Sequence, residues 1–295
     1  MLVMKKSIFA FVLIFILQGC SSSRLSYEEY LNVIKAYPDY EYEAPIDLPK
    51  FTYANVSDTN FVKIRNVFGL DSIAGNGDEV SRILNLMKWV HNSIKHDGSK
   101  KNPLPISTFN IVEVCKSENR GVNCRGLAVM LNEVYLSMGF KSRYIACLPV
   151  ERLFDDCHVI NTVYSNKLNK WIYIDPTYSA YLTDENGEML SIQEVRDRIV
   201  TGKNIIVNDD INWNGQPYDS SKYLAYMSKN LFRLVSPVEG EYDYESKSNR
   251  KFVELIPKGY DTSMNIFSSI LSKLKSAFSK MEYYYTSNPN YFWER

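Results

Sequence analysis

The segment of residues 121–139, which reads GVNCRGLAVMLNEVYLSMG, constrains the fold of this chain more than any other part. Its apolar residues recur at intervals of three and four, which is the repeat of one buried face of an α-helix. Asn123 belongs to the residue types that cap helix N-termini, and Gly139 stands where a left-handed residue commonly follows a helix. The segment therefore predicts a helix whose first turn carries Cys124.

Three strand patterns follow that helix, at residues 141–149, 157–165 and 171–175. Each is a short run rich in β-branched and aromatic residues, and residues 166–167 supply a turn signal between the second and the third. A helix followed by antiparallel strands is typical of the α+β class. We therefore expect an α+β fold in which the cysteine-bearing helix packs on an antiparallel sheet, with a helical C-terminal embellishment.

The helical period also predicts elements on both sides of this unit. One helix precedes the cysteine at residues 78–95, and three follow the strands at residues 191–200, 218–230 and 265–284. Residues 100–120 contain Pro103 and Pro105 and then an apolar run, which predicts a loop followed by a short helix or strand. No internal repeat or long linker separates these elements, so we expect one folded unit.

The start of the chain differs in character from the rest. Lys5 and Lys6 precede ten unbroken apolar residues, from Ile8 to Leu17. A basic start followed by a short apolar run is typical of a signal peptide, and this run is too short to span a membrane as a helix. Residues 17–20, LQGC, resemble the bacterial lipobox, in which the cysteine is lipid-modified and becomes the N-terminus. The alternative is a cleaved secretory signal with an incidental cysteine.

These features divide the chain into predicted segments and predict a location. The segments are a lipoprotein signal peptide at 1–19, a tether at 20–50, a folded core at 51–205 and a C-terminal extension packed on the core at 206–295. We expect the protein in the bacterial cell envelope, anchored in the membrane through a lipid on Cys20. It would face the periplasm or the cell surface.

Charge and cysteine content narrow the partners. Lysine plus arginine and aspartate plus glutamate number 34 each, so no broad positive field favours nucleic acid, and we expect no nucleic-acid partner. Secretion would permit a disulfide between Cys147 and Cys157. A zinc site is the rival interpretation, but the cysteines lack CxxC spacing. We expect no metal and no cofactor.

The position of Cys124 indicates a reactive thiol. A cysteine in the first turn of a helix faces the positive end of the macrodipole, which lowers the thiol pKa and favours the nucleophilic thiolate. The alternative is a structural role, because cysteine is among the most buried residue types and Cys124 lies on the apolar stripe. A base beside the thiol would favour the first interpretation.

His158 and Asp175 are the candidates for that base and for the acid that orients it. If residues 166–167 form a two-residue turn, His158 and Asp175 face each other across adjacent strands. If the turn centres on residues 167–168 instead, Asp175 faces Ile160 and remains a diagonal neighbour of His158 on the same face. In either register the carboxylate could orient the imidazole, which would take the thiol proton. A solvent-facing histidine and a strand-ending acid are the structural alternatives.

Four blocks of the chain resemble the transglutaminase-like superfamily, a branch of the papain-like cysteine enzymes. The resemblance implies a papain-like fold for the core, which would be catalytic, with Cys124 as nucleophile, His158 as general base and acid, and Asp175 as orienting carboxylate. It also implies an oxyanion hole that uses the backbone N–H of Cys124, with a second donor that the sequence does not assign. The blocks, between about Val80 and Thr177, are MKWVHNSIKHD, GVNCRGLAVMLNEVYLSMGFKSRYI, CHVINTVY and KWIYIDPTY.

Other residues near these blocks are candidates for substrate binding. Arg120 and Arg125 flank the thiol in sequence and could bind a substrate carboxylate, or could form a solvated charge cluster. Trp89 lies off the apolar stripe of its predicted helix and is either a cleft wall or a packing contact. His91 and His96 are expected to be surface or packing histidines, because neither has an acid or a thiol at helical spacing.

Two classes of function remain open. The first is thiol-dependent acyl transfer through a thioester, which hydrolyses a peptide or amide when water is the acceptor and joins two molecules when an amine is. Its substrates would be peptides, proteins or cell-wall peptides outside the cytoplasm. The second is a catalytically inactive, lipid-anchored binding or scaffolding module of the same fold, and a metal-binding lipoprotein is a third possibility. The intact trio favours an enzyme, and the lack of an Asp/Glu-rich calcium loop favours a peptidase or amidase over calcium-dependent crosslinking.

Overall fold

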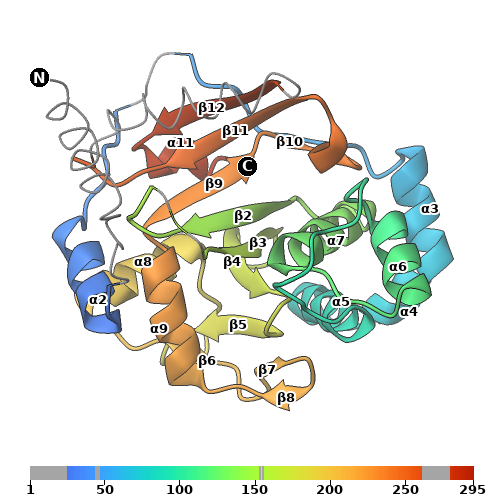
Figure 1. The fold of residues 1–295 in the computed structure, drawn as a ribbon, viewed down its shortest axis with the longest axis horizontal. Helices are drawn as coiled ribbons and strands as arrows, with labels where there is room; N and C mark the ends of the chain where they lie inside the picture. Colours follow the sequence, from blue (N-terminus) through green and yellow to red (C-terminus); the bar gives the residue numbers. More distant parts are fainter. Residues whose placement is uncertain (1–24, 44–46, 153, 155, 261–279) are drawn as a thin grey trace, which may run out of the picture.

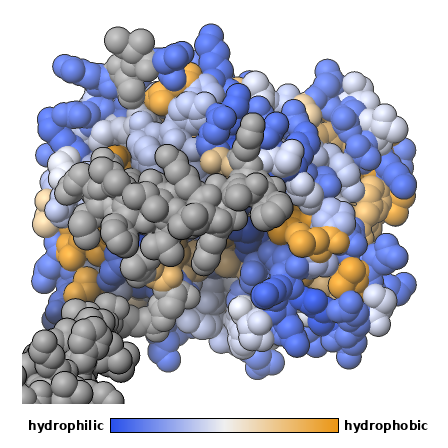
Figure 2. Space-filling view, turned by 45° about the horizontal axis from the view of Figure 1, so that its top comes forward, coloured by the Kyte–Doolittle hydropathy of each residue, from blue (hydrophilic) through white to orange (hydrophobic). Residues whose placement is uncertain are grey.

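The computed structural model of the protein describes residues 25–43, 47–152, 154, 156–260 and 280–295. The predicted signal peptide, the lipid-attachment residue Cys20 and most of the predicted helix at 265–284 lie outside the described residues. Among the helices in the described ranges, none has the length and hydropathy needed to cross a membrane. On the face drawn in Figure 2, hydrophobic residues form small separate patches among hydrophilic ones.

One large sheet runs through the centre of the molecule (Figure 1). Within the described residues it has eight strands in the order β12-β11-β9-β2-β3-β4-β5-β6. Neighbouring strands are antiparallel except β11 and β12, which are parallel. The strands are β2 (Ser142–Leu148), β3 (His158–Ser165), β4 (Lys170–Asp175), β5 (Ala180–Thr183), β6 (Ile206–Val207), β9 (Arg233–Pro237), β11 (Asn249–Leu255) and β12 (Lys280–Thr286).

Two small strand pairs lie outside this sheet. The short strands β1 (Thr52–Tyr53) and β10 (Glu239–Gly240) are parallel. The strands β7 (Asn212–Trp213) and β8 (Gln216–Pro217) form an antiparallel hairpin. This β7–β8 hairpin lies near the C-terminal end of α5 (Glu79–Ser93), because His91 of that helix contacts Asn212.

Helices cover the central sheet in two groups, which lie on opposite sides of the molecule in Figure 1. The first group is α3 (Thr59–Phe68), α4 (Leu70–Ala74), α5, α6 (Thr108–Ser117) and α7 (Cys124–Ser137). The second is α2 (Tyr27–Ala36), α8 (Ile192–Thr201), α9 (Ser220–Asn230) and α11 (Pro289–Phe292), and a 3-10 turn, η1, spans Tyr244–Ser246.

The alternation of side chains along the strands explains why both faces of the sheet are covered. Ile172 and Ile174 of β4 pack with the core beneath the first helical group, whereas Tyr173 packs with the core beneath the second. Successive side chains of a strand point to opposite faces, and every residue of β3 is buried. The sheet is therefore a central layer between two hydrophobic cores, and the predicted α+β class is confirmed.

Helix α7 is the most deeply buried helix of the first group, and the predicted cysteine helix is confirmed. It begins at Cys124, and the side chain of Asn123 caps it by accepting a backbone N–H bond from its first turn. All residues in Gly126–Ser137 are buried. They include Glu133, whose carboxylate accepts hydrogen bonds from the backbone N–H and the hydroxyl of Thr108 at the start of α6.

Most of the other predicted elements are also observed. The helices expected at 78–95, 191–200 and 218–230 are α5, α8 and α9, and the three expected strands are β2, β3 and β4. For residues 100–120 the sequence predicts a loop followed by either a short helix or a strand, and the structure has a loop followed by the helix α6. Gly139 adopts the left-handed conformation expected after α7, with φ of 82°.

The connection between β3 and β4 is longer than a two-residue turn. It occupies residues 166–169, where Asn169 has a left-handed φ of 51°. The longer loop lets the carboxylate of Glu79 accept bonds from Ser165 Oγ and the backbone N–H of Lys167, at 2.5 and 2.8 Å. These contacts explain why the two-residue turn is not formed.

The longer loop also decides the register of the two strands. Asn161 pairs with Ile174, and this register continued to the strand ends sets Asp175 opposite Ile160. The expectation that His158 and Asp175 face each other directly is therefore wrong. The alternative register, in which they are diagonal neighbours, is the one observed.

The C-terminal extension is more than a helical embellishment. Residues 206–295 supply β6, β9, β11 and β12 to the central sheet, and β12 begins within the stretch expected to be the helix 265–284. The run of tyrosines at 283–285 explains the difference, because aromatic side chains favour the pleated surface of a sheet. The division of the chain at residue 205 stays a prediction, but the extension completes the sheet of the core.

The end of the chain is attached to β2 by a buried cation. The Arg143 guanidinium lies 4.1 Å from the ring centroid of Phe51 and 4.7 Å from that of Trp171. It donates a hydrogen bond of 2.8 Å to the backbone carbonyl of Phe292. Trp171 in turn donates to the carbonyl of Trp293 at 2.7 Å. The last residues are thus held against the sheet from two strands.

The loop before Cys124 passes very close to the chain after α5. Val122 and Lys95 share a backbone hydrogen bond of 3.1 Å, and Asp97 donates its N–H to the Val122 carbonyl at 2.7 Å. A Cβ added to Gly121 would lie 2.4 Å from the backbone oxygen of Lys95. Only glycine allows this approach without a shift of backbone.

We predict that Gly121→Ala lowers the free energy of unfolding by roughly 1–3 kcal/mol, because the methyl group forces two backbone segments apart. Chemical denaturation followed by tryptophan fluorescence measures this. Gly98→Ala is the matched control, because a Cβ there meets only His96 at an ordinary 3.6 Å, and its stability should be unchanged or slightly higher. Equal stability of Gly121→Ala and the wild type would contradict the prediction.

Candidate active site

Cys124 stands at the N-terminus of α7, and its side chain is half-buried. The cap residue before it is fixed by Asn102, which donates Nδ2–H to Asn123 Oδ1 at 2.8 Å and accepts the Asn123 N–H at 3.1 Å. Gly126 lets Asn102 come this close, because a Cβ on Gly126 would lie 2.7 Å from its amide oxygen. The first turn of the helix and its thiol are therefore held in one position.

His158 begins β3 and Asp175 ends β4, so both lie at the same end of an antiparallel pair of strands. The diagonal register brings the Nε2 of His158 to 2.7 Å from the Oδ2 of Asp175. Both side chains are buried, with 2% and 0% of their surfaces exposed. A carboxylate can only accept, so Nε2 carries the hydrogen of this bond.

Further donors hold the carboxylate of Asp175 in place. The backbone N–H of Thr177 donates to Oδ1 at 2.8 Å, and the hydroxyl of Tyr223 on α9 donates to Oδ2 at 2.8 Å. The hydroxyls of Tyr223 and Tyr173 are 2.6 Å apart, and because Tyr223 gives its hydrogen to Asp175, Tyr173 must be the donor in that contact. The buried acid is thus oriented by contacts from two elements.

The thiol of Cys124 and the imidazole of His158 line the same cleft, and each shifts the pKa of the other. Since Nε2 is bonded to Asp175, the nitrogen that faces the sulfur is Nδ1. The structure therefore brings Cys124, His158 and Asp175 together, with His158 between the thiol and the carboxylate, in the order that the sequence predicts.

The surroundings of Cys124 and His158 favour the charged forms of both side chains. Burial opposes the charged form of His158, but the charge of Asp175 and its hydrogen bond outweigh burial and raise the pKa of His158 to about 10. Burial also opposes the thiolate of Cys124, but hydrogen bonds with His158 and His96 outweigh it and lower the thiol pKa to about 6. These opposite shifts favour a thiolate and an imidazolium over the neutral pair.

The thiol opens into a cleft of about 280 Å³. The ring of His158 lies between two tyrosines of the cleft lining, with centroids 5.7 Å from Tyr178 and 5.4 Å from Tyr226. Tyr226 donates its hydroxyl to Asp156 or to the carbonyl of Cys157, each at 3.1 Å. A reactant can therefore approach the sulfur between aromatic walls.

The three predicted substrate-binding residues lie in different places. Arg125 lines the cleft, where its guanidinium forms an ion pair of 2.8 Å with the buried carboxylate of Glu245. Arg120 donates to the backbone carbonyls of Gly121 and of Lys101, which lies in the loop before α6, and it is not part of the cleft lining. Trp89 packs against Phe68 with ring centroids 5.4 Å apart, within the core of the first helical group.

His96 also lines the cleft, which the sequence analysis did not predict. Its side chain is among the groups that lower the pKa of the Cys124 thiol. The sequence signal that could have indicated a role in the site is the position of His96 in the block MKWVHNSIKHD, one of the blocks that carry the family resemblance. His91, by contrast, is the expected packing histidine, because it is buried and both of its ring nitrogens have partners, the Pro176 carbonyl and Asn212 Oδ1.

The other cysteines are separate from this chain of contacts. Cys115, Cys147 and Cys157 are free thiols in the structure, so the disulfide considered between Cys147 and Cys157 is not formed. Burial raises the pKa of the Cys157 thiol to about 11, which makes it a weak nucleophile although it lines the same cleft. Among the described residues, no cluster of histidine, cysteine and acidic side chains is arranged to hold a metal ion.

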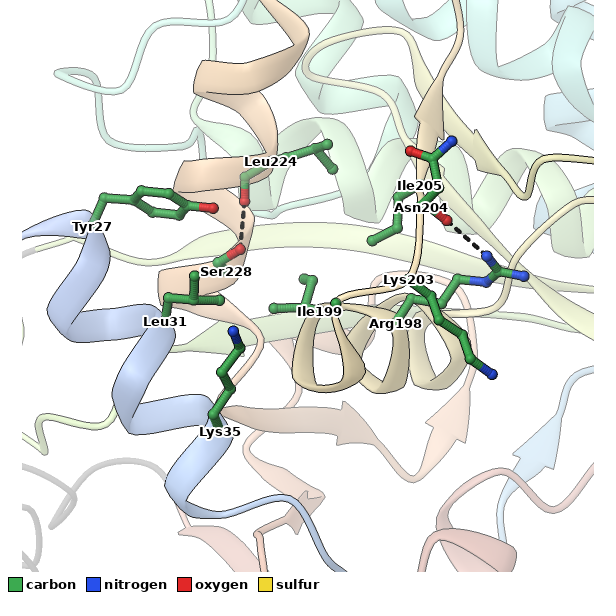
Figure 3. Close-up of a pocket in the computed structure, with 11 residues that line it drawn as sticks. Tyr27, Leu31, Lys35, Arg198, Ile199, Lys203, Asn204, Ile205, Leu224 and Ser228 are labelled. Carbon is green, nitrogen blue, oxygen red and sulfur yellow. Dashed lines mark hydrogen bonds between the residues drawn. The ribbon is translucent and has the colours of Figure 1, made fainter.

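A second cavity, of about 390 Å³, lies between α2, α9 and the C-terminal end of α8 (Figure 3). Its lining includes Lys35, Lys203 and Arg198, and Arg198 donates to the carbonyl of Asn204 at 2.7 Å. The residues described around it include no cysteine or histidine. Thiol chemistry therefore belongs to the smaller cleft at Cys124.

A comparison with protein families supports the resemblance that the sequence suggests. Residues 69–176 match the family model of the transglutaminase-like superfamily, and this range contains Cys124, His158 and Asp175. The resemblance read from the sequence is therefore confirmed for that part of the chain. No curated protein matches the chain.

One solved structure that resembles the chain is a protein of Cytophaga hutchinsonii described as a candidate cysteine protease. The two sequences are 18% identical, and the alignment has a TM-score of 0.32. It covers 58% of this chain and 64% of the other, which is less than two thirds of that protein's length.

We predict that alkylation of Cys124 by iodoacetamide follows a pH midpoint near 6, whereas an ordinary cysteine has a midpoint near 9. The lowered pKa means that the thiolate persists as the pH falls and is lost only when the pH passes through about 6. His158→Ala should move the midpoint upward. Burial raises the thiol pKa, and the variant lacks the His158 interactions that lower it. Adduct formation is followed by mass spectrometry of the intact protein.

Cys124→Ser gives the background for this measurement, because it retains Cys157, whose raised pKa keeps it unreactive over the same range. A midpoint near 9 in the wild type would contradict the predicted thiolate–imidazolium pair.

Proposed function

We propose that this protein is an enzyme that breaks amide or peptide bonds through a thioester on Cys124, with His158 as general base and acid and Asp175 as the orienting carboxylate. The observation that supports this most strongly is the arrangement of the three side chains, in which the thiol and His158 share one cleft and His158 is hydrogen-bonded to the buried Asp175. Acyl transfer needs a nucleophile, a proton carrier and a group that holds the carrier, and these three side chains supply them.

In the first half of the proposed reaction, the thiolate of Cys124 attacks the carbonyl carbon of the substrate. A carbon–sulfur bond forms while the π electrons of the carbonyl move to oxygen. The imidazolium of His158 then gives its Nδ1 proton to the substrate nitrogen, the carbon–nitrogen bond breaks, and the carbonyl re-forms. An amine leaves and a thioester remains on Cys124.

In the second half, His158 is neutral and can accept a proton at Nδ1. It takes this proton from water as the water oxygen attacks the thioester, and the carbon–sulfur bond then breaks to release an acid and restore the thiolate. An amine in place of water would give transfer instead of hydrolysis. Asp175 keeps Nε2 protonated throughout, so the ring presents the same nitrogen to the sulfur in both halves.

The proposed setting is the bacterial cell envelope, with a lipid on Cys20 as the membrane anchor. The proposed substrates are peptides, proteins or cell-wall peptides outside the cytoplasm. The lipobox-like sequence LQGC and the short apolar run before it support this setting. The alternative of an inactive scaffold of the same fold does not require an oriented thiolate in an open cleft.

We predict that Cys124→Ser folds but loses at least ~10³-fold in the rate of nitrophenol release from p-nitrophenyl acetate, because a hydroxyl at neutral pH is a far weaker nucleophile than the thiolate. The wild type should carry the acetyl group on Cys124 when quenched and examined by mass spectrometry. Cys115→Ser is the matched control, because Cys115 lies in the core away from the cleft, and its rate should equal that of the wild type.

Absence of acetylation in folded wild-type protein would contradict the enzyme and favour the scaffold. Loss of folding in Cys124→Ser, judged by circular dichroism, would show that the thiol has a structural role.

We predict that Asp175→Asn folds but reacts roughly 10²-fold or more slowly with the same ester. The carboxylate accepts from His158, Tyr223 and the N–H of Thr177, so an amide must turn its NH₂ group toward one of these donors. The variant also loses the charge that stabilises the imidazolium. The alkylation midpoint of Cys124 should therefore rise above 6.

Asp71→Asn is the control for this substitution, because Asp71 pairs with Arg65 on the exposed surface. Unchanged turnover in Asp175→Asn would remove Asp175 from the mechanism.

A further inference from the structure

His96 presents one defined nitrogen to the cleft. The indole N–H of Trp213 lies 3.0 Å from His96 Nδ1. An indole nitrogen can only donate, so Nδ1 must be the acceptor and carries no hydrogen. The hydrogen of the neutral ring is therefore on Nε2. His96 and Cys124 line the same cleft, and the interaction between them favours the thiolate, so this Nε2–H is the group that faces the sulfur.

The β7–β8 hairpin holds His96 by its backbone as well as by its ring. Asn214, next to Trp213, accepts the His96 N–H at 2.8 Å and donates Nδ2–H to the His96 carbonyl at 3.0 Å. Asn212 accepts from His91 Nε2 at 2.7 Å, which ties the hairpin to α5. Three consecutive hairpin residues thus contact this short stretch of chain.

The opposite side of His96 is held by the loop that leads into α7. His96 and Val122 form a parallel β-bridge, and the close approach at Gly121 keeps the two segments together. Val122 is two residues before Cys124. The imidazole and the thiol therefore belong to two adjacent backbone segments that are hydrogen-bonded to each other. The position of His96 beside the sulfur is therefore built into the backbone.

We propose that the Nε2–H of His96 and the backbone N–H of Cys124 together bind the oxyanion that forms on the substrate carbonyl, and that Trp213 keeps His96 in the tautomer that can donate. This inference rests on the proposed acyl-transfer function and assigns its second oxyanion donor. The Cys124 N–H is suited to the same task, because it is in the first turn of α7 and has no intrahelical acceptor.

The proposed role involves hydrogen bonding and no proton transfer by His96. In the resting state its N–H donates to the thiolate. When the sulfur forms its bond to carbon, the negative charge moves to the carbonyl oxygen, and the same N–H can then donate to that oxygen. The charge returns to sulfur when the thioester is broken. A donor that follows this charge stabilises the transition states more than the free substrate.

Two reactions of Cys124 separate this role from activation of the thiol. Acetylation by p-nitrophenyl acetate passes through an oxyanion, whereas alkylation by iodoacetamide forms none. We expect His96→Ala to slow acetylation by roughly 10²- to 10³-fold. Alkylation, measured at a pH where the thiol is ionised in both proteins, should change by less than about 5-fold, since no oxyanion needs to be bound.

His96→Gln tests the chemistry of the donor and guards against a folding defect. Its side-chain amide retains an N–H, so it should recover at least ~10-fold of the acetylation lost in His96→Ala. Trp213→Phe should slow acetylation by up to about 10-fold, the value of one neutral hydrogen bond. Trp89→Phe is its matched control and should react as the wild type does, because Trp89 packs in the core away from the cleft.

The outcomes separate this inference from the function on which it rests. Equal acetylation rates in folded His96→Ala and wild type would overturn the oxyanion role while the enzyme stands. Parallel losses of acetylation and alkylation would also overturn it and limit His96 to thiol activation. A wild type that is alkylated at Cys124 but never acetylated would overturn the proposed function itself.

Discussion

The buried hydrogen bond between His158 and Asp175 is the contact on which the rest of the site depends. A carboxylate without solvent is costly unless its oxygens are satisfied, and here Thr177, Tyr223 and the imidazole satisfy them. The same contact fixes which nitrogen of the ring faces Cys124. The register of β3 and β4, the position of α9 and the tautomer of His158 are therefore linked through one buried acid.

The side chains of the site come from different parts of the sequence, and the fold holds them in place together. The thiol comes from the start of α7, the imidazole and the acid from one end of the central sheet, and the second imidazole from the segment after α5. Residues beyond 205 complete the arrangement, because α9 supplies Tyr223 and the β7–β8 hairpin supplies Trp213. The C-terminal extension is thus part of the chemistry of the cleft as well as of the sheet.

Local signals in the sequence were enough to predict α7, the strands after it and the proximity of His158 and Asp175, whereas the family resemblance implied that Cys124 joins them. The exact register could not be predicted, since a shift of the turn keeps His158 and Asp175 on the same face and the Glu79 contacts that select the longer loop are remote. His96 was missed for a similar reason, because its partner Trp213 is 117 residues away. The strands of the extension were missed because a mixed aromatic and apolar run fits helical and strand patterns alike.

The strand order has a consequence for how this chain acquires its structure during synthesis. Strand β9 lies between β2 and β11, and Arg143 in β2 is covered by the last residues of the chain. The central layer is therefore incomplete, with the Arg143 guanidinium uncovered, until both β9 and the segment that contains Phe292 have been synthesised.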